Sequence, residues 1–219
     1  MHVQTCQNMT YLSSLKPDKL DVCCHIRQCE NMDRNGSARQ AHVLETALTV
    51  FARHGFSKTS IEDIAKAAGI SRQGIYLHFK NKDEIFGASI QKTLDDGLRA
   101  ANKVFDDDRL TLEEKLLKAL DEWFGRHVGL FHPEASDLGA QCERLLGDAV
   151  EKSSASFQKK LEKVILAWSA RKTKGADKRA STIAGMLWAC GLTWKHNFSS
   201  RQEFLEKMRD TIHLCCREL

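Results

Sequence analysis

Residues 59–82 read TSIEDIAKAAGISRQGIYLHFKNK, and this stretch decides the fold. Thr59 and Glu62 have the spacing of a capping box, in which a hydroxyl and a carboxylate each bind the other residue's backbone amide. The pattern predicts a short helix over 60–67. Gly69 follows this helix and supplies the conformational freedom that a sharp turn requires.

A second short helix is predicted over 72–79, with Ser71 as its N-cap. Ile75 and Phe79 lie on its inner face. Two short helices that are joined by a glycine turn and pack on a preceding helix form a helix-turn-helix arrangement. The outer face of the second helix then carries Arg72, Gln73, Gly74 and Tyr76.

The outer residues have the chemistry of DNA recognition. Arg72 can bind O6 and N7 of guanine, and Gln73 can bind N6 and N7 of adenine, both in the major groove. Gly74 removes a side chain where helix and DNA would approach most closely, at a cost in helix propensity. Tyr76 lies near His78 and is well placed for a phosphate oxygen. Plainer interpretations stay open: a surface tyrosine, a solvated arginine and a core histidine.

Helical periodicity continues on both sides of this motif. A helix is predicted over 38–54 and ends at Gly55. Asn81 caps a helix that reaches about Phe105. Further helices are expected at about 112–129, 136–151, 153–171, 177–195 and 200–216. The sequence therefore predicts an all-α fold, with a three-helix DNA-binding domain followed by a six-helix bundle.

Composition and charge fit this organisation. The 219 residues are 42% apolar and 28% charged, and no stretch of 18 residues lacks charge, which argues against a membrane span. No secretory signal pattern begins the chain, so we expect a cytoplasmic protein. Residues 34–92 hold nine basic and five acidic residues, which equals the whole net charge of +4. A basic segment of this kind predicts an anionic partner such as double-stranded DNA.

The first residues differ from the rest of the chain. We interpret residues 1–36 as a disordered leader, with Met32 as an alternative start of translation. Two domains are then expected, a DNA-binding domain at 37–86 and a ligand-binding and dimerisation domain at 87–219. Within the leader, four residues have the types of a thiolate metal site but lack two well-spaced cysteine pairs: Cys23, Cys24, His25 and Cys29.

Two other classes of protein stay open at this point. A helical enzyme or metalloprotein could use the leader cysteines, although the chain has no phosphate-binding glycine loop, H-E-x-x-H motif or nucleophile elbow. A helical adaptor could bind an acidic protein through its basic segment. We favour neither, and expect no enzymatic activity, no metal and no cofactor.

The order and spacing of the motifs from Ala47 to Phe86 resemble the DNA-binding domain of the TetR/AcrR transcriptional regulators. The resemblance implies a homodimeric repressor that binds a palindromic operator and is released by a small molecule. It also implies base contacts by Arg72, Gln73 and Gly74. Phosphate contacts are implied for Thr59, Ser60, Tyr76, His78 and Lys82.

The resemblance places the effector and the dimer contact in the later helices. Most of the aromatic residues of the later helices are expected to be ordinary core, and the alternative is an apolar cavity lined by some of Trp123, Phe124, His127, Phe131, Cys142 and Trp168. We expect the last two helices to pair with those of a second copy. The residues expected at that contact are Ile183, Met186, Leu187, Cys190, Phe204, Met208 and Ile212.

Overall fold

The computed structural model describes residues 37–130, 132, 135–169 and 175–217. The chain separates into two compact units, 1–42 and 43–219, and of the first only the helical residues 37–42 are described. The expected leader, its cysteines and Met32 lie outside the described residues. No helix in the described ranges is long and apolar enough to cross a membrane.

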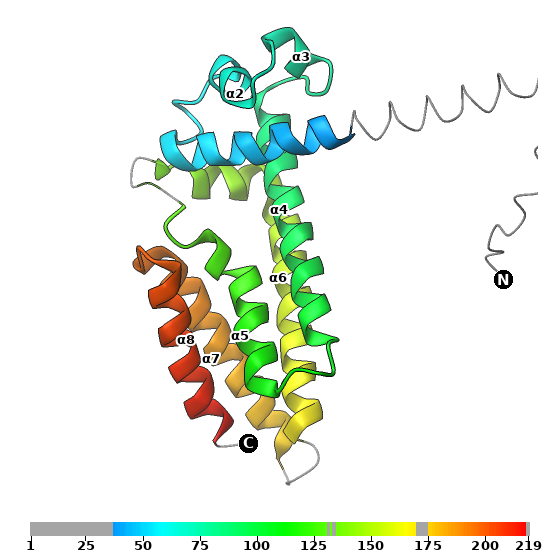
Figure 1. Ribbon diagram of the computed structural model, residues 1–219, viewed down its shortest axis with the longest axis vertical. Helices are drawn as coiled ribbons and strands as arrows, with labels where there is room; N and C mark the ends of the chain where they lie inside the picture. The colour runs from blue at the N-terminus through cyan, green and yellow to red at the C-terminus, as the bar shows by residue number, and fades with distance from the viewer. Residues whose placement is uncertain (1–36, 131, 133–134, 170–174, 218–219) are drawn as a thin grey trace, which may run out of the picture. The chain divides into compact units, whose positions relative to one another are not determined.

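All regular structure among the described residues is helical, as the sequence predicts, and no strand occurs in this part of the chain. Residues 37–54 form the first helix. The helices that follow, shown in Figure 1, are α2 (Ile61–Ala68), α3 (Arg72–Tyr76), α4 (Lys82–Phe105), α5 (Leu112–Trp123), the 3-10 turn η1 (Gly125–His127), α6 (Leu138–Ser169), α7 (Ala176–Asn197) and α8 (Arg201–Cys216).

The structure corrects three predicted boundaries. The two helices expected at 136–151 and 153–171 are one continuous helix, α6, because the polar run between them contains no proline or glycine to break it. The helix expected to reach 129 ends at Trp123 and continues only as η1. The second helix of the motif ends at Tyr76, since the amide of His78 bonds the Ile75 carbonyl and tightens the last turn.

The head, defined here as residues 43–90, has an aromatic core. Phe51 and Phe86 meet edge to face with ring centroids 5.1 Å apart, and Phe56 stacks on Phe51 at 5.7 Å. Ile64 of α2 and Ile75 of α3 are fully buried in the same cluster. Because Phe86 belongs to α4, the long helix is anchored in the head by its first turns.

The start of α6 completes the core of the head. Ala135 and Leu138 are buried in the same apolar cluster as the head residues. The Asp137 carboxylate accepts hydrogen bonds from the amides of Phe56 and Ser57, at 2.9 and 2.7 Å. No local sequence pattern predicts this long-range cap, because the partners lie 80 residues apart.

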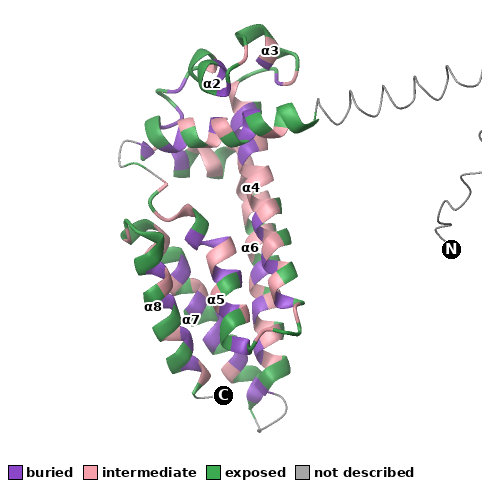
Figure 2. Ribbon diagram, in the orientation of Figure 1, coloured by how far each residue is buried: buried purple, intermediate pink, exposed green. Residues whose placement is uncertain are grey.

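The remaining helices form a bundle with a second apolar cluster. Here α4 packs on α5 and α6, α6 packs on α7, and α8 packs on α5 and α7. The inward faces are buried and the outward faces exposed (Figure 2). Phe157 of α6 lies near its centre and stacks on Trp123 of α5 with centroids 4.9 Å apart.

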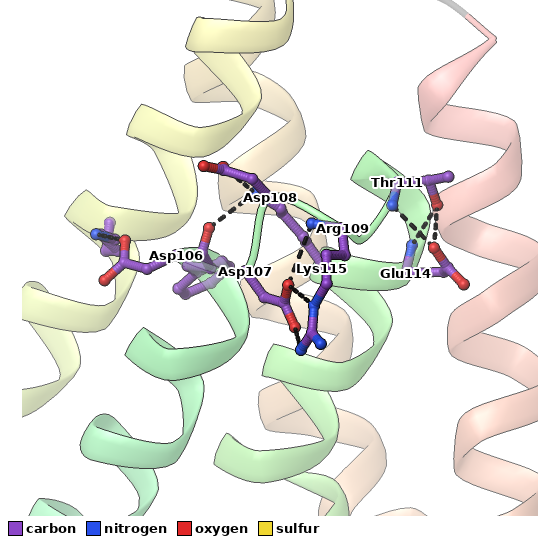
Figure 3. Close-up of polar contacts among 9 residues, drawn as sticks. Asp106, Asp107, Asp108, Arg109, Thr111, Glu114 and Lys115 are labelled. Atoms are coloured by element: carbon purple, nitrogen blue, oxygen red, sulfur yellow. Dashed lines mark hydrogen bonds and ion pairs between the residues drawn. The ribbon is translucent and has the colours of Figure 1, made fainter.

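The turn from α4 to α5 is held by polar contacts (Figure 3). Arg109 donates two hydrogen bonds to the Asp107 carboxylate, both at 2.8 Å. Thr111 and Glu114 form a capping box at the start of α5, with the Thr111 amide 2.8 Å from the Glu114 carboxylate. These contacts fix the direction in which α5 leaves α4.

Candidate nucleic-acid interface

The N-terminus of α2 is capped one residue later than the sequence pattern predicts. Ser60 is the N-cap, and it exchanges hydrogen bonds with Asp63 in the capping box expected for Thr59 and Glu62. The hydrogen bonds from Ser60 lower the pKa of the Asp63 carboxyl, so the box is intact at neutral pH.

Thr59 has a different role from the one expected. Its side chain is only 2% exposed, and its hydroxyl donates to the Gly55 carbonyl at 2.7 Å. The prediction that Thr59 contacts phosphate through its side chain is therefore wrong, because the group is buried and already bonded. Ser60, one residue on, is exposed.

The turn between α2 and α3 is built as expected. Gly69 has a φ of +66°, and its amide bonds the carbonyls of Ala65 and Lys66 at the end of α2. Ser71 then caps α3 through a hydrogen bond of 3.0 Å from the Gly74 amide. The turn thus presents the first residues of α3 to solvent.

The exposed edge of α3 carries an ordered arginine. The Arg72 Nη2 atom donates to the Tyr76 hydroxyl at 3.2 Å, and the guanidinium carbon lies 5.6 Å from the centroid of the Tyr76 ring. Arg72 and Gln73 are exposed, and Tyr76 is 45% exposed. Because the Tyr76 oxygen accepts this bond, its own hydroxyl proton remains available for another acceptor.

The packing around Gly74 leaves space for a Cβ atom at this position. A Cβ atom built there would lie 3.4 Å from the Ser71 hydroxyl oxygen and 3.9 Å from Ile70, which are ordinary contacts. Its φ is not in the left-handed region. Neither crowding nor backbone conformation within the described chain therefore requires glycine at this position.

The remaining predicted phosphate contacts differ in their surroundings. Lys82 donates from Nζ to the carbonyls of Phe56 and Thr59, each at 2.8 Å, and Nζ lies 4.4 Å from the centroid of the Phe56 ring, so its ammonium holds the preceding loop. His78 is half-buried, with its ring 6.3 Å from that of Phe79. Tyr76 and Ser60 are thus the more accessible members of the set.

Sequence reasoning missed two features of this surface. Leu77, directly after α3, is 83% exposed, which no periodicity argument indicated. An open groove between the first helix and α2 collects basic side chains around Asp63. These are Arg53, His54, Lys58 and Lys66, and the uneven charge of the sequence is the signal that could have located them.

The bundle contains a cavity of about 210 Å³ that brings together four of the six residues expected to line a pocket. They are Trp123, Phe124, His127 and Cys142. Burial, together with the positive charges of Arg126 and Lys195, lowers the pKa of His127 to about 4, so the imidazole is neutral at pH 7. Lys195 also lines the cavity, and the sequence analysis did not single it out.

The other two expected pocket residues are not in this cavity. Trp168 is 47% exposed and lines a separate hollow near the turn from α4 to α5, so its assignment to the pocket is wrong. The reason is the unbroken α6, which carries Trp168 to the far end of the bundle. Phe131 lies outside the described residues.

Most of the residues expected at the dimer contact are covered by their own chain. Five of them have buried side chains in the core of the bundle: Ile183, Leu187, Phe204, Met208 and Ile212. Placing them at the contact was wrong, since a side chain buried in the protomer core cannot also cover a second copy. Met186 is 51% exposed, and Cys190 is half-buried.

Comparison with known proteins identifies relatives of the head. Residues 43–88 match the model of the bacterial regulatory proteins of the tetR family. The chain is 46% identical over 65 residues to the HTH-type transcriptional regulator YfiR of Bacillus subtilis, covering 30% of this chain and 32% of that protein. It is 51% identical over 45 residues to the HTH-type transcriptional regulator AcrR of Shigella flexneri, covering 20% of this chain and 21% of the other. The chain thus spans a third or less of these relatives.

The likeness of fold extends further than the likeness of sequence. A transcriptional regulator from Rhodococcus sp. Rha1 superposes with a TM-score of 0.61, covering 82% of this chain and 96% of that one, at 16% identity. At this identity the match supports the fold alone. The sequence match is therefore confined to the head, and the fold match includes the bundle.

Proposed function

We propose that this chain, whose residues 43–88 match the model of the tetR family, is a homodimeric TetR/AcrR-type repressor that binds a palindromic operator and is released by a small molecule. The observation that carries this proposal is the exposed edge of α3. It offers an ordered Arg72, an exposed Gln73 and a glycine that the protein's own packing does not require. This is the chemistry of a helix that enters the major groove.

The proposed contacts follow from which atoms are free. Arg72 and Gln73 read base edges through bidentate hydrogen bonds. Tyr76 donates its hydroxyl to a phosphate, and the exposed Ser60 and the half-buried His78 are proposed as further phosphate contacts. Lys82 acts mainly by holding the loop before α2 in place.

The proposed dimer contact lies on the exposed face of α7. Every exposed residue of α7 between 181 and 193 is uncharged, and most are small: Ser181, Thr182, Gly185, Met186, Ala189, Leu192 and Thr193. The exposed face of α8 is mostly charged by contrast. A second copy is the occupant that suits the α7 face, because an isologous contact pairs the same neutral patch with itself.

We propose that α4 transmits the effect of ligand binding from the cavity to the head. The cavity of about 210 Å³ is lined by Leu48 of the first helix, by Ile90, Thr93, Leu94 and Gly97 of α4, and by residues of the bundle. A ligand there touches the helix whose first turns are anchored in the head by Phe86. The ligand shifts the equilibrium between the DNA-bound and the released conformation only by its preference for one position of α4. A change in the position of α4 changes the spacing of the two α3 helices in the proposed dimer.

Fluorescence anisotropy on the purified full chain tests this function. Fragments selected from genomic DNA give the operator, and we expect a palindrome whose half-sites lie about 34–36 Å apart or at that spacing plus further turns. Binding should weaken steeply as salt increases. A monomer in sedimentation analysis, or binding to acidic protein with no duplex preference, would contradict the proposal and favour an adaptor.

Gly74→Ala separates a requirement of DNA binding from one of folding. We expect the variant to be more stable by up to about 1 kcal/mol, because alanine is the better helix former and the added Cβ meets only ordinary contacts. Operator affinity should nevertheless fall tenfold or more, since the methyl group occupies the closest approach to DNA. Thermal unfolding and anisotropy measure the two effects.

Gly87→Ala is the matched control. A Cβ atom at Gly87, also in a helix, would meet nothing within 4 Å. This variant should gain stability and keep its operator affinity. Equal affinities for both variants would show that Gly74 does not face the DNA.

A further inference from the structure

The cavity of the bundle carries one lysine on a wall that is otherwise apolar, aromatic or neutral. The described residues that line it include no aspartate or glutamate, and Lys195 of α7 supplies an ammonium group. That group lies 5.8 Å from the centroid of the Phe124 ring. Within the described residues, no carboxylate lies at ion-pair distance from Lys195. The cation is therefore half-buried, and no described residue supplies an anion to compensate it.

The other titratable groups of the cavity do not compensate this charge. Burial raises the pKa of the Cys142 thiol, which keeps it protonated. His127 is neutral at pH 7, as its pKa of about 4 requires. Burial lowers the pKa of Lys195 itself, and this shift measures how poorly the surroundings support the charge. An anion beside Nζ would remove that penalty and restore the ordinary pKa.

Flat aromatic surfaces form much of the rest of the cavity. Trp188 meets Phe124 edge to face with centroids 5.0 Å apart, and Trp123 lies 6.3 Å from Trp188. The volume of about 210 Å³ compares with about 150 Å³ for a cavity that accepts benzene. Scaling from the six carbons of benzene gives room for a body of roughly eight non-hydrogen atoms.

We infer that the effector is a small organic acid with a compact, ring-sized apolar body, whose carboxylate pairs with Lys195 while the body lies against Trp123, Phe124 and Trp188. This assignment rests on the proposed function, since it takes the cavity to be the effector site. The carboxylate and the ammonium form a charge-assisted hydrogen bond beside the aromatic wall of the cavity. No sequence pattern indicates this site, because one lysine in a helix resembles any solvated charge.

Three probes of the same shape and different charge test the inference on the full chain at pH 7. Benzoate is the anion, benzamide is neutral and benzylamine is the cation. By isothermal titration calorimetry we expect benzoate to bind about 10- to 100-fold more tightly than benzamide, the range for a hydrogen bond between charged groups. Benzylamine should bind most weakly. Equal or tighter binding of benzamide, or no detectable binding of benzoate, would overturn the inference.

Substitution of the lysine tests its role. Lys195→Met keeps the length and apolar body of the side chain, and it should reduce benzoate affinity to the level of benzamide while leaving benzamide unchanged. Lys207→Met, at an exposed lysine of α8, is the matched control and should change neither affinity. Unaltered binding of benzoate by Lys195→Met would contradict the inference. The wild-type comparison does not depend on the folding of any variant.

DNA binding is measured separately, so that the two proposals fail in different ways. If the chain binds its operator but shows no preference for benzoate, only the ligand class is wrong. If benzoate binds as expected and the operator complex is unaffected, the ligand class is supported and the proposed release of DNA is contradicted.

Discussion

Arg72→Ala is expected to remove most of the discrimination between the operator and unrelated duplex DNA. The guanidinium is exposed and already ordered by Tyr76, so little side-chain entropy is lost when it binds a guanine. Loss of a good bidentate base contact costs about 1–3 kcal/mol, which corresponds to roughly 5- to 150-fold in operator affinity. Anisotropy titrations against the operator and a scrambled duplex give the ratio of the two affinities.

The losses of affinity for the two duplexes show whether Arg72 contacts a base or a phosphate. Affinity for the scrambled duplex should fall much less than affinity for the operator, since phosphates contribute most of non-specific binding. The matched control is Arg209→Ala, at an exposed arginine of α8, which removes the same charge far from the motif along the chain. An equal loss on both duplexes would reassign Arg72 to the phosphate backbone.

Phe86→Ala is expected to unfold the head before the bundle. Phe86 is fully buried, it contacts Phe51 and Phe56, and its removal leaves a cavity between α4 and the rest of the head. Such a truncation costs about 3–5 kcal/mol. Operator binding should be lost at temperatures where most of the helical signal remains.

Hydrogen exchange locates the damage. In Phe86→Ala the amides of α2 and α3 should lose protection while those of α5 and α8 keep it, because the two apolar clusters are separate. Phe204→Ala, at an equally buried phenylalanine of α8, should show the reverse order. Loss of protection throughout both variants would mean that the clusters unfold as one unit.

The sequence predicts those parts of the molecule that depend on near neighbours. The turn at Gly69 and the cap at Ser71 depend on residues within four positions, so they could be predicted. The cap of α2 shows the limit of such arguments. Thr59 with Glu62 and Ser60 with Asp63 have the same spacing, and only the burial of Thr59 decides between them.

The sequence-based predictions that the structure contradicts concern what a helix face packs against. Periodicity showed correctly that Phe204 and Ile212 lie on an apolar face, but not that the protomer itself covers that face. The continuity of α6 could not be predicted for a related reason. Packing in the bundle stabilises the polar stretch in the middle of α6, whose local sequence alone does not favour a helix. The proposed role of Lys195 depends on the aromatic residues around it, Trp123 and Phe124 at the end of α5 and Trp188 on its own helix α7.

The dependence of the head on the start of α6 has a practical consequence for grafting. A chimera that joined residues up to 90 to a foreign effector domain would leave the amides of Phe56 and Ser57 without the carboxylate of Asp137. It would also open the apolar floor that Ala135 and Leu138 close. The smallest portable reader of DNA in this protein is therefore discontinuous in sequence, and an exchange between regulators must carry both pieces together.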